Sequence, residues 1–344
     1  MKRIISYSLL AVFVVLILTT CFSPWTGNSG NLTLVWGNTG SERWEFDNSS
    51  FGNFNYVVTL RGPGGTIEKR FEKGIGSANF DVIPGTWNVT IKGYEPIYVG
   101  GQGGNLSLMG IEQIEVKAGQ KKSETIVMHN AVEVNSWNEL VSCLTISLVY
   151  PSYIPQSIPG TSPPEYRSFL FLINNDLEVD SFISIPTDVP VILVAEEDVR
   201  IYRDTSHIGS FFSATSSTGG SLTLGMKGMS GTLTLDGESN ALYPGVLVNT
   251  DASFSLTMHS GVTIKNNRNG ITSEGIGINI HQMATFEMHG GTITGNYTGV
   301  FSPGNFTMYN GTITGNDIGV DKYTMGTFTK KGGTVSGNGV NIKE

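Results

Sequence analysis

Cysteine and charged residues are both scarce in this chain of 344 amino acids. It has two cysteines, and Lys, Arg, Asp and Glu together make up 15% of the residues, whereas glycine occurs 44 times. If Cys21 carries a lipid, as the N-terminal pattern described below implies, Cys143 is the one remaining cysteine and cannot form a disulfide within one molecule. Few charges with many glycines and threonines are typical of an all-β, turn-rich extracellular protein.

A surplus of positive charge is also missing, because the formal net charge is −8. The acidic residues are concentrated around residues 133–198. Binding to nucleic acid needs a basic patch, so this balance argues against a nucleic-acid partner. The length of the chain favours two domains.

Long apolar runs are missing except at the N-terminus, where Met1-Lys2-Arg3 precedes an apolar stretch from Ile4 to Leu18. Fifteen residues of helix span roughly 22 Å, which is short of the ~30 Å hydrocarbon core of a bilayer. This pattern predicts a secretory signal peptide over residues 1–20 rather than a membrane span.

The apolar run ends in Leu-Thr-Thr-Cys21, which resembles a bacterial lipobox, although Gly, Ala or Ser is usual where Thr20 stands. The resemblance implies that Cys21 is lipidated and that residues 21–30 form a tether from a membrane. An ordinary signal peptide followed by an incidental cysteine is the alternative.

The C-terminal part of the chain repeats one short sequence. Residues 290–296 read GGTITGN, residues 310–316 read NGTITGN, residues 332–338 read GGTVSGN, and a fainter copy covers residues 256–267. The regular copies recur every 20 to 22 residues. A period of this length predicts a solenoid, in which each unit buries its apolar face only against its neighbours.

Within each unit apolar and polar residues alternate with period two, and Gly and Asn mark the turns. Glycine adopts positive φ without steric cost, and asparagine tolerates it best among the other residues. Strands that recur once per unit stack in parallel, as in a β-helix. We therefore expect one internal column of phenylalanines and one of branched aliphatic residues: Phe286, Phe306 and Phe328, and Ile293, Ile313 and Val335.

The preceding residues, 31–130, contain short alternating strand patterns divided by turn signals such as GPGG at 62–65. Several short strands at this spacing predict an antiparallel β-sandwich. The segment DVIPGTWNVTIKGY at 81–94 resembles one hairpin of small Ig-like or carboxypeptidase-regulatory-like modules.

One short helix is predicted between the two parts, at residues 136–144. Ser136 and Glu139 have the spacing of a capping box, and Trp137, Leu140, Val141 and Leu144 form one apolar face. Such a helix would cover the open end of the first coil. The proline-rich segment 150–166 is interpreted as a projecting loop, and the β-helix domain is expected to cover residues 131–344.

Several motifs of the second domain resemble a known group of proteins. FISIP, VRIYRD, GSLTL and GTLTLDG are followed by units of the form F-x-M…GTITGN. Together they look like bacterial surface proteins with a pectin-lyase-like right-handed parallel β-helix. The likeness is strongest to spirochaete (treponemal) lipoproteins and looser to chlamydial polymorphic outer-membrane proteins. It covers roughly residues 131–344 and is more specific for architecture than for function.

The resemblance implies an exported lipoprotein at the outer membrane or cell surface, working as an adhesin or binding protein for an extracellular protein or a glycan. It implies no cofactor. Two alternatives stay open: a polysaccharide lyase or hydrolase on the same fold, and a passive structural component of the envelope.

Hydrolases of this fold need carboxylates placed around the scissile bond. We interpret the sequence as lacking the set of Asn-Thr-Asp, Asp-Asp, Gly-His-Gly and Arg-Ile-Lys motifs that such enzymes carry, so we assign no catalytic residue and expect no enzymatic activity. The one carboxylate cluster consists of Glu196, Glu197 and Asp198, close to Arg200 and His207. It is a candidate calcium or sugar site, with a solvated turn as the alternative.

Histidines 259 and 289 follow equivalent positions of their units, and Tyr309 and Lys331 stand at the next two equivalent positions. A zinc site needs three or four ligands in fixed geometry. The pattern therefore favours an exposed column of mixed residues over a metal site, and no metal is assigned. His281 lies between the two histidines in sequence.

Two further features concern the outer surface and the last unit. Thr-x-Thr pairs flank Ile293 and Ile313; threonine suits an exposed strand, and an ice-binding solenoid is the alternative. Lys330 stands where the earlier units have an inward methionine. Because lysines at a sheet edge discourage docking of another chain, we expect a monomer; a frayed last coil is the alternative.

Overall fold

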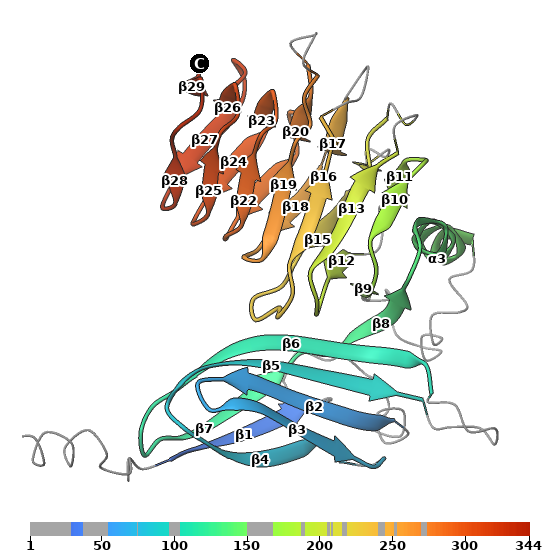
Figure 1. The fold of residues 1–344 in the computed structure, drawn as a ribbon, viewed down its shortest axis with the longest axis vertical. Coiled ribbons are helices and arrows are strands. Elements are labelled where there is room, and N and C mark those ends of the chain that lie inside the picture. Colours follow the sequence, from blue (N-terminus) through green and yellow to red (C-terminus); the bar gives the residue numbers. More distant parts are fainter. Residues whose placement is uncertain are drawn as a thin grey trace, which may run out of the picture.

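The computed structural model describes residues 29–36, 54–73, 75–95, 104–149, 168–186, 190–204, 207, 209–214, 219–239, 245–250, 253–269 and 274–344. The predicted signal peptide, Cys21, nearly all of the tether and the proline-rich segment lie outside these residues. Figure 1 shows two all-β parts, a sandwich and a long stack of short strands. Among the described residues, no helix is both long and apolar enough to cross a bilayer.

The N-terminal part is a β-sandwich. A small sheet has the order β4-β1-β7, and the facing layer has the order β3-β2-β5-β6. The strands are β1 (Gly30–Trp36), β2 (Asn55–Gly62), β3 (Gly65–Phe71), β4 (Ser77–Val82), β5 (Gly85–Tyr94), β6 (Leu106–Val116) and β7 (Lys121–Ile126). β1 pairs antiparallel with β4 but parallel with β7, so the predicted antiparallel sandwich contains one parallel pair. Alternate residues of the two layers form one buried core that includes Leu34, Trp36 and Trp87.

The C-terminal part is a right-handed parallel β-helix, as predicted, in which each coil adds one strand to each of three sheets (Figure 1). The first set of coil strands belongs to a long sheet: β9 (Phe169–Ile173), β12 (Val191–Val194), β15 (Gly220–Leu224), β18 (Phe254–Met258), β21 (Thr285–Met288), β24 (Asn305–Met308) and β27 (Thr327–Lys330).

The other two sheets consist of coil strands alone. The second sheet contains β10 (Leu177–Val179), β13 (Val199–Arg203), β16 (Leu233–Asp236), β19 (Val262–Lys265), β22 (Thr292–Thr294), β25 (Thr312–Thr314) and β28 (Thr334–Val335). The third contains β11 (Ile183–Ile185), β14 (Phe212–Ala214), β17 (Val246–Asn249), β20 (Ile276–Asn279), β23 (Thr298–Phe301), β26 (Ile318–Asp321) and β29 (Val340–Lys343).

The predicted internal columns are confirmed. Phe286, Phe306 and Phe328 stack in register, with ring centroids 4.7 Å apart in both pairs. Ile293 and Ile313 pair in the next sheet and are fully buried, and Val335 continues that column. The last coil is less covered, because Phe328 and Val335 are only partly buried and Lys330, opposite the buried Met308, is exposed.

The asparagine of each repeat has a different role from the one predicted. Asn296, Asn316 and Asn338 do not adopt positive φ, whereas the preceding glycines do, Gly295 and Gly315 at 67°. The backbone N–H of Asn296 donates to Oδ1 of Asn316 over 3.0 Å, and that of Asn316 donates to Oδ1 of Asn338 over the same distance. The asparagines therefore form a hydrogen-bonded ladder along the coils, buried at Asn296 and Asn316.

The faint first copy shows how the two roles divide. Asn266 lies beside Gly295 in the neighbouring coil and takes the positive φ of 58°, while Asn267 is buried and donates its N–H to Asn296 Oδ1 over 3.0 Å. Nη2 of the buried Arg203 donates to Asn267 Oδ1 over 3.2 Å. The ladder thus has a guanidinium at its N-terminal end.

The predicted helix is α3 (Trp137–Val149), which continues beyond residue 144. Glu139 N–H donates to Ser136 Oγ over 3.2 Å, and the Glu139 carboxylate accepts from Asn135 N–H over 2.9 Å, so the capping pair forms one residue wider than the usual box. Trp137, Leu140 and Leu144 are buried in the core of the first coils. The helix therefore covers the N-terminal end of the β-helix, as expected (Figure 1).

The two parts of the molecule share one sheet. β8 (His129–Val134) pairs antiparallel with β6 of the sandwich and parallel with β9 of the first coil, which gives a sheet of twelve strands within the described residues. The outward side chains of β9 and β12 are buried against the sandwich, in a cluster of Leu106, Met109, Ile111, Ala131, Leu170, Leu172, Ile192 and Val194. We call this contact the joint.

We expect Phe306→Ala to lower the free energy of unfolding by about 3–5 kcal/mol, because it empties a space in the phenylalanine column. Thr312→Ala in the same coil faces partly outward and is expected to cost less than about 1 kcal/mol. Urea denaturation of both variants measures this. A larger loss for Thr312→Ala would mean that the register of the strands is inverted.

His129, at the start of β8, gives the joint a pH dependence. Its Nδ1 lies 2.5 Å from Ser168 Oγ, and burial lowers the pKa of its imidazole to about 4. In the unfolded chain the histidine has a pKa near 6.5, so as the pH drops the unfolded state binds a proton before the folded state does. The free energy of unfolding therefore falls between about pH 6.5 and about pH 4, by up to about 3 kcal/mol. His129→Asn keeps a polar partner for Ser168 and is expected to remove this slope.

The exposed His281 supplies the control, because His281→Asn should leave the slope of stability against pH unchanged. Urea midpoints measured from pH 7 to pH 4 for the wild type and both variants decide the matter. Equal slopes in all three proteins would contradict the assignment.

Candidate functional site

The carboxylates of Glu196, Glu197 and Asp198 do not converge on one point. Glu196 forms an ion pair with Lys92 of the sandwich strand β5. Asp198 Oδ1 accepts from the backbone N–H and the hydroxyl of Thr232, over 3.1 and 2.8 Å. Glu197 is exposed. Two of the three carboxylates are therefore used to hold the turn and the joint.

The neighbouring charged residues are likewise engaged in local contacts. Arg200 pairs with Glu238 and lies 3.7 Å from Asp236, and Lys265 lies 3.2 Å from Asp236. Arg203 is buried, and burial lowers the pKa of its guanidinium to about 10. In the part of the chain that the structure describes, no group of three or more His, Cys, Asp or Glu side chains could hold a metal ion.

The interpretation that all of the enzyme motifs are absent is wrong for one of them, because an Asn-Thr-Asp triplet stands at residues 249–251. Asn249 Oδ1 accepts from Asn279 Nδ2 over 2.7 Å, and the Thr250 hydroxyl lies 3.1 Å from the Asn279 carbonyl oxygen and accepts from His281 N–H over 3.0 Å. Asp251 lies outside the described residues. The first two residues of the triplet connect adjacent coils of the β-helix.

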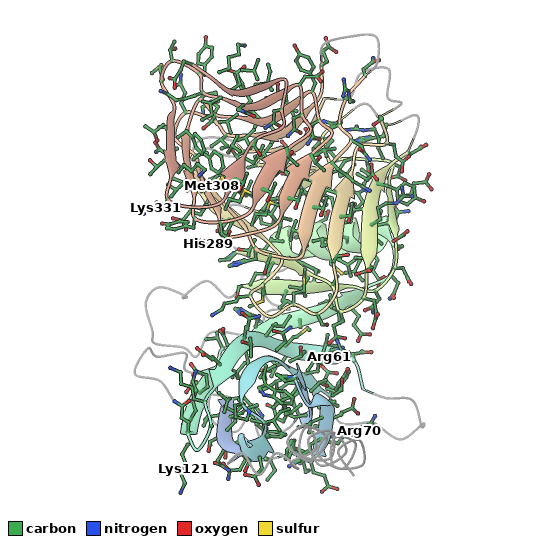
Figure 2. All side chains as sticks on the ribbon, turned by 60° about the vertical axis from the view of Figure 1, so that its left-hand side comes forward. Arg61, Arg70, Lys121, His289, Met308 and Lys331 are labelled. Atoms are coloured by element: carbon green, nitrogen blue, oxygen red, sulfur yellow. The ribbon has the colours of Figure 1, made fainter. Side chains whose placement is uncertain are left out.

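The outer column predicted from the repeats does form. The rings of His259 and His289 stack with centroids 5.4 Å apart, and those of His289 and Tyr309 stack at 4.6 Å. Lys331 Nζ lies 4.6 Å from the centroid of the Tyr309 ring. Figure 2 shows His289 and Lys331 on the same side of the coil. We call these four residues, at the turn that follows the long sheet, the ridge.

His281 is not part of the ridge. It lies in the turn between β20 and β21, whereas His289 follows the other end of β21. The two histidines of the ridge are therefore the two that stand at equivalent repeat positions.

The electrostatics of the ridge are uneven along its length. His289 Nε2 lies 3.1 Å from a carboxylate oxygen of Glu287, which points outward from β21. Burial, and to a lesser degree the charge of His289, lower the pKa of the His259 imidazole. Lys331 Nζ lies 3.4 Å from the Tyr309 hydroxyl. The ridge thus has a lysine side chain at one end and, because the pKa of His259 is lowered, a neutral imidazole at the other end at neutral pH.

A threonine-rich face adjoins the ridge on the second sheet. Thr263, Thr292, Thr312 and Thr334 stand in register on four successive coils, and Thr294 pairs with Thr314 beside them. Most of these side chains are partly buried. The Thr-x-Thr alignment predicted from the repeats is therefore present on successive coils.

Comparisons of the chain with models of known protein families, with curated proteins and with solved structures found no match. The description of the fold therefore rests on the strand order and register of this structure.

We expect Glu196→Gln to lower the free energy of unfolding by about 1–2 kcal/mol, because it leaves Lys92 without its carboxylate in a half-buried joint. The two side chains are 15% and 23% exposed, so solvent screens part of the effect. The matched variant Glu197→Gln, one residue away and exposed, should change stability by less than about 0.5 kcal/mol. Thermal or urea unfolding compares the two variants, and equal losses of stability would mean that Glu196 does not stabilise the joint.

Proposed function

We propose that this protein is an exported bacterial lipoprotein of the spirochaete type, anchored through Cys21, which displays its β-helix as a binding surface for an extracellular protein or glycan. The observation that supports this proposal best is the joint. The sandwich and the coils share a continuous sheet and a buried cluster, and Arg61 of β2 donates to Ser230 beside the coils (Figure 2). A stalk built in this way holds the coils at a fixed side of the sandwich.

The position of β1 fits an anchor at the N-terminus. β1 belongs to the small sheet, whereas the coils continue the opposite layer of the sandwich. Figure 1 shows the small sheet on the side away from the coils. A lipid attached shortly before β1 would therefore place the sandwich next to the membrane and the β-helix beyond it.

The acidic stretch supports a binding role over an enzymatic one. A lyase or hydrolase of this fold would need carboxylates that are available to a sugar. Glu196 and Asp198, from the one carboxylate cluster in the sequence, are engaged by Lys92 and Thr232. The exposed outer surface instead offers hydroxyls and the mixed ridge.

A monomeric form belongs to the same proposal. Lys330 and its exposed side chain lie in β27, at one edge of the long sheet. Lysine on an edge strand opposes pairing with another chain. Light scattering of Lys330→Met across concentrations tests this role, and a variant that stays as monomeric as the wild type would refute it.

Detergent phase partition tests the anchor. The wild type is expected in the detergent phase and Cys21→Ala in the aqueous phase, because only the former receives a lipid. Recovery of both proteins in the aqueous phase would refute lipidation. The soluble Cys21→Ala protein, screened against matrix proteins and glycans, tests the binding role, and a passive envelope component would bind none of them.

A further inference from the structure

The acidic residues of the regular coils are all matched by bases. Within residues 276–344 they are Glu287, Asp317, Asp321 and Glu344. Arg268 lies 3.0 Å from Asp317, Lys343 lies 3.0 Å from Asp321, Lys322 lies 2.5 Å from Glu344, and His289 lies 3.1 Å from Glu287. No side-chain carboxylate of these described coils is thus left without a basic neighbour.

Two lysines at the end of the ridge have no such match. Lys330 and Lys331 are both exposed, and neither forms an ion pair with a carboxylate in the described residues. Lys331 instead packs over the Tyr309 ring. A chain with a net charge of −8 therefore has a local excess of positive charge at the last coil of its β-helix, where Lys331 ends the ridge and Lys330 stands in register with Met308.

The stacking decides which atoms of the ridge a ligand can reach. His289 has His259 on one face of its ring and Tyr309 on the other, with ring planes 17° and 5° from parallel. Tyr309 has His289 on one face and Lys331 on the other. The ring faces are covered, so the exposed parts are edges, which present imidazole nitrogens and a phenol hydroxyl. Such edges form hydrogen bonds and offer no platform for stacking a sugar ring.

We infer that the ridge, together with Lys330, binds an anionic polymer that carries sulfate or carboxylate groups, and that this binding strengthens in mild acid. This inference rests on the proposed binding function and names the chemistry of its ligand. Ammonium groups and imidazole N–H donors in a row suit the oxygens of such anions. Successive coils lie about 4.8 Å apart, so the donors follow one line along which a chain can lie.

The dependence on pH follows from the groups that face the two imidazoles. The carboxylate of Glu287 lies beside His289, and Tyr309 and then Lys331 lie on the face of the His289 ring that is opposite His259. The pKa of His259 is lowered by burial and by His289. Imidazole is the side chain that gains positive charge in mild acid, at His259 only at the lower pH that its burial sets, while sulfate and most carboxylate groups stay ionised. Affinity for an anion is therefore expected to rise from pH 7.5 to pH 5.5.

Three polymers with one backbone test the inference on the Cys21→Ala protein: dextran sulfate, carboxymethyl dextran and uncharged dextran. Titration at constant moderate salt is expected to show binding of at least one charged polymer and none of uncharged dextran. The two charged polymers distinguish sulfate from carboxylate as the preferred group. Equal binding of uncharged dextran would overturn the inference.

Matched variants separate the ridge from overall charge. The double variant Lys330→Gln with Lys331→Gln is expected to weaken binding about tenfold. The control, Lys117→Gln with Lys121→Gln, removes the same charge from the exposed sandwich surface and should weaken binding less than about twofold. Glu287→Gln should tighten binding at pH 7.5, because it removes the acid of the ridge. Equal losses in the two lysine pairs would overturn the inference.

The double variant His259→Gln with His289→Gln is expected to lose the gain in affinity between pH 7.5 and pH 5.5. Retention of that gain would overturn the role of the imidazoles. Far-ultraviolet circular dichroism and urea midpoints show whether each variant is folded. A matrix protein or glycan whose binding ignores all ridge variants would leave the proposed function intact and refute the ridge as its site.

Discussion

The alignment of each coil on the next is the constraint from which the other features of the β-helix follow. The buried side chains of Asn296 and Asn316 fix this alignment. The Oδ1 atom of each accepts a hydrogen bond from a backbone N–H of the preceding coil, over 3.0 Å. The side-chain nitrogen of Asn316 in turn donates to the carbonyl oxygens of Ile293 and Thr314, over 3.1 and 3.2 Å. A buried amide without these partners would cost about 1–3 kcal/mol. A shift of one residue would break every rung, so the same register also fixes the phenylalanine column inside and the ridge outside.

The long sheet meets two different environments along its length, and the residues on its outer face change accordingly. At β9 and β12 the outward residues are apolar, such as Leu170 and Ile192, and the sandwich covers them. At β18 and β21 the outward residues include Thr257 and Glu287, which face solvent. A strand buried on both faces needs a continuous apolar sequence, whereas a strand buried on one face alternates. The joint is therefore encoded in the first coils themselves.

The repeat made the β-helix predictable, because equivalent residues of identical units must stack. That reasoning placed Phe306, Ile313 and the four ridge residues correctly. It misjudged the asparagines, since Asn is compatible both with positive φ and with a buried ladder, and only the register shows which applies. The runs FLFLI at 169–173 and VILV at 191–194 predicted strands but not what covers them. Glu196 is separated from its partner Lys92 by 104 residues of sequence, a distance that no local pattern spans.

Removal of one coil tests most directly whether residue-by-residue alignment of the coils holds the β-helix together. Deletion of residues 297–316 joins Asn296 to Asp317 and removes one full repeat, since Asn296 and Asn316 are 20 residues apart. This account predicts a folded protein with one cooperative unfolding transition and a shorter ladder. Deletion of residues 297–315 instead shifts the register by one residue and should abolish cooperative unfolding of the last coils. Identical unfolding curves for the two deletions, measured by circular dichroism in urea, would contradict it.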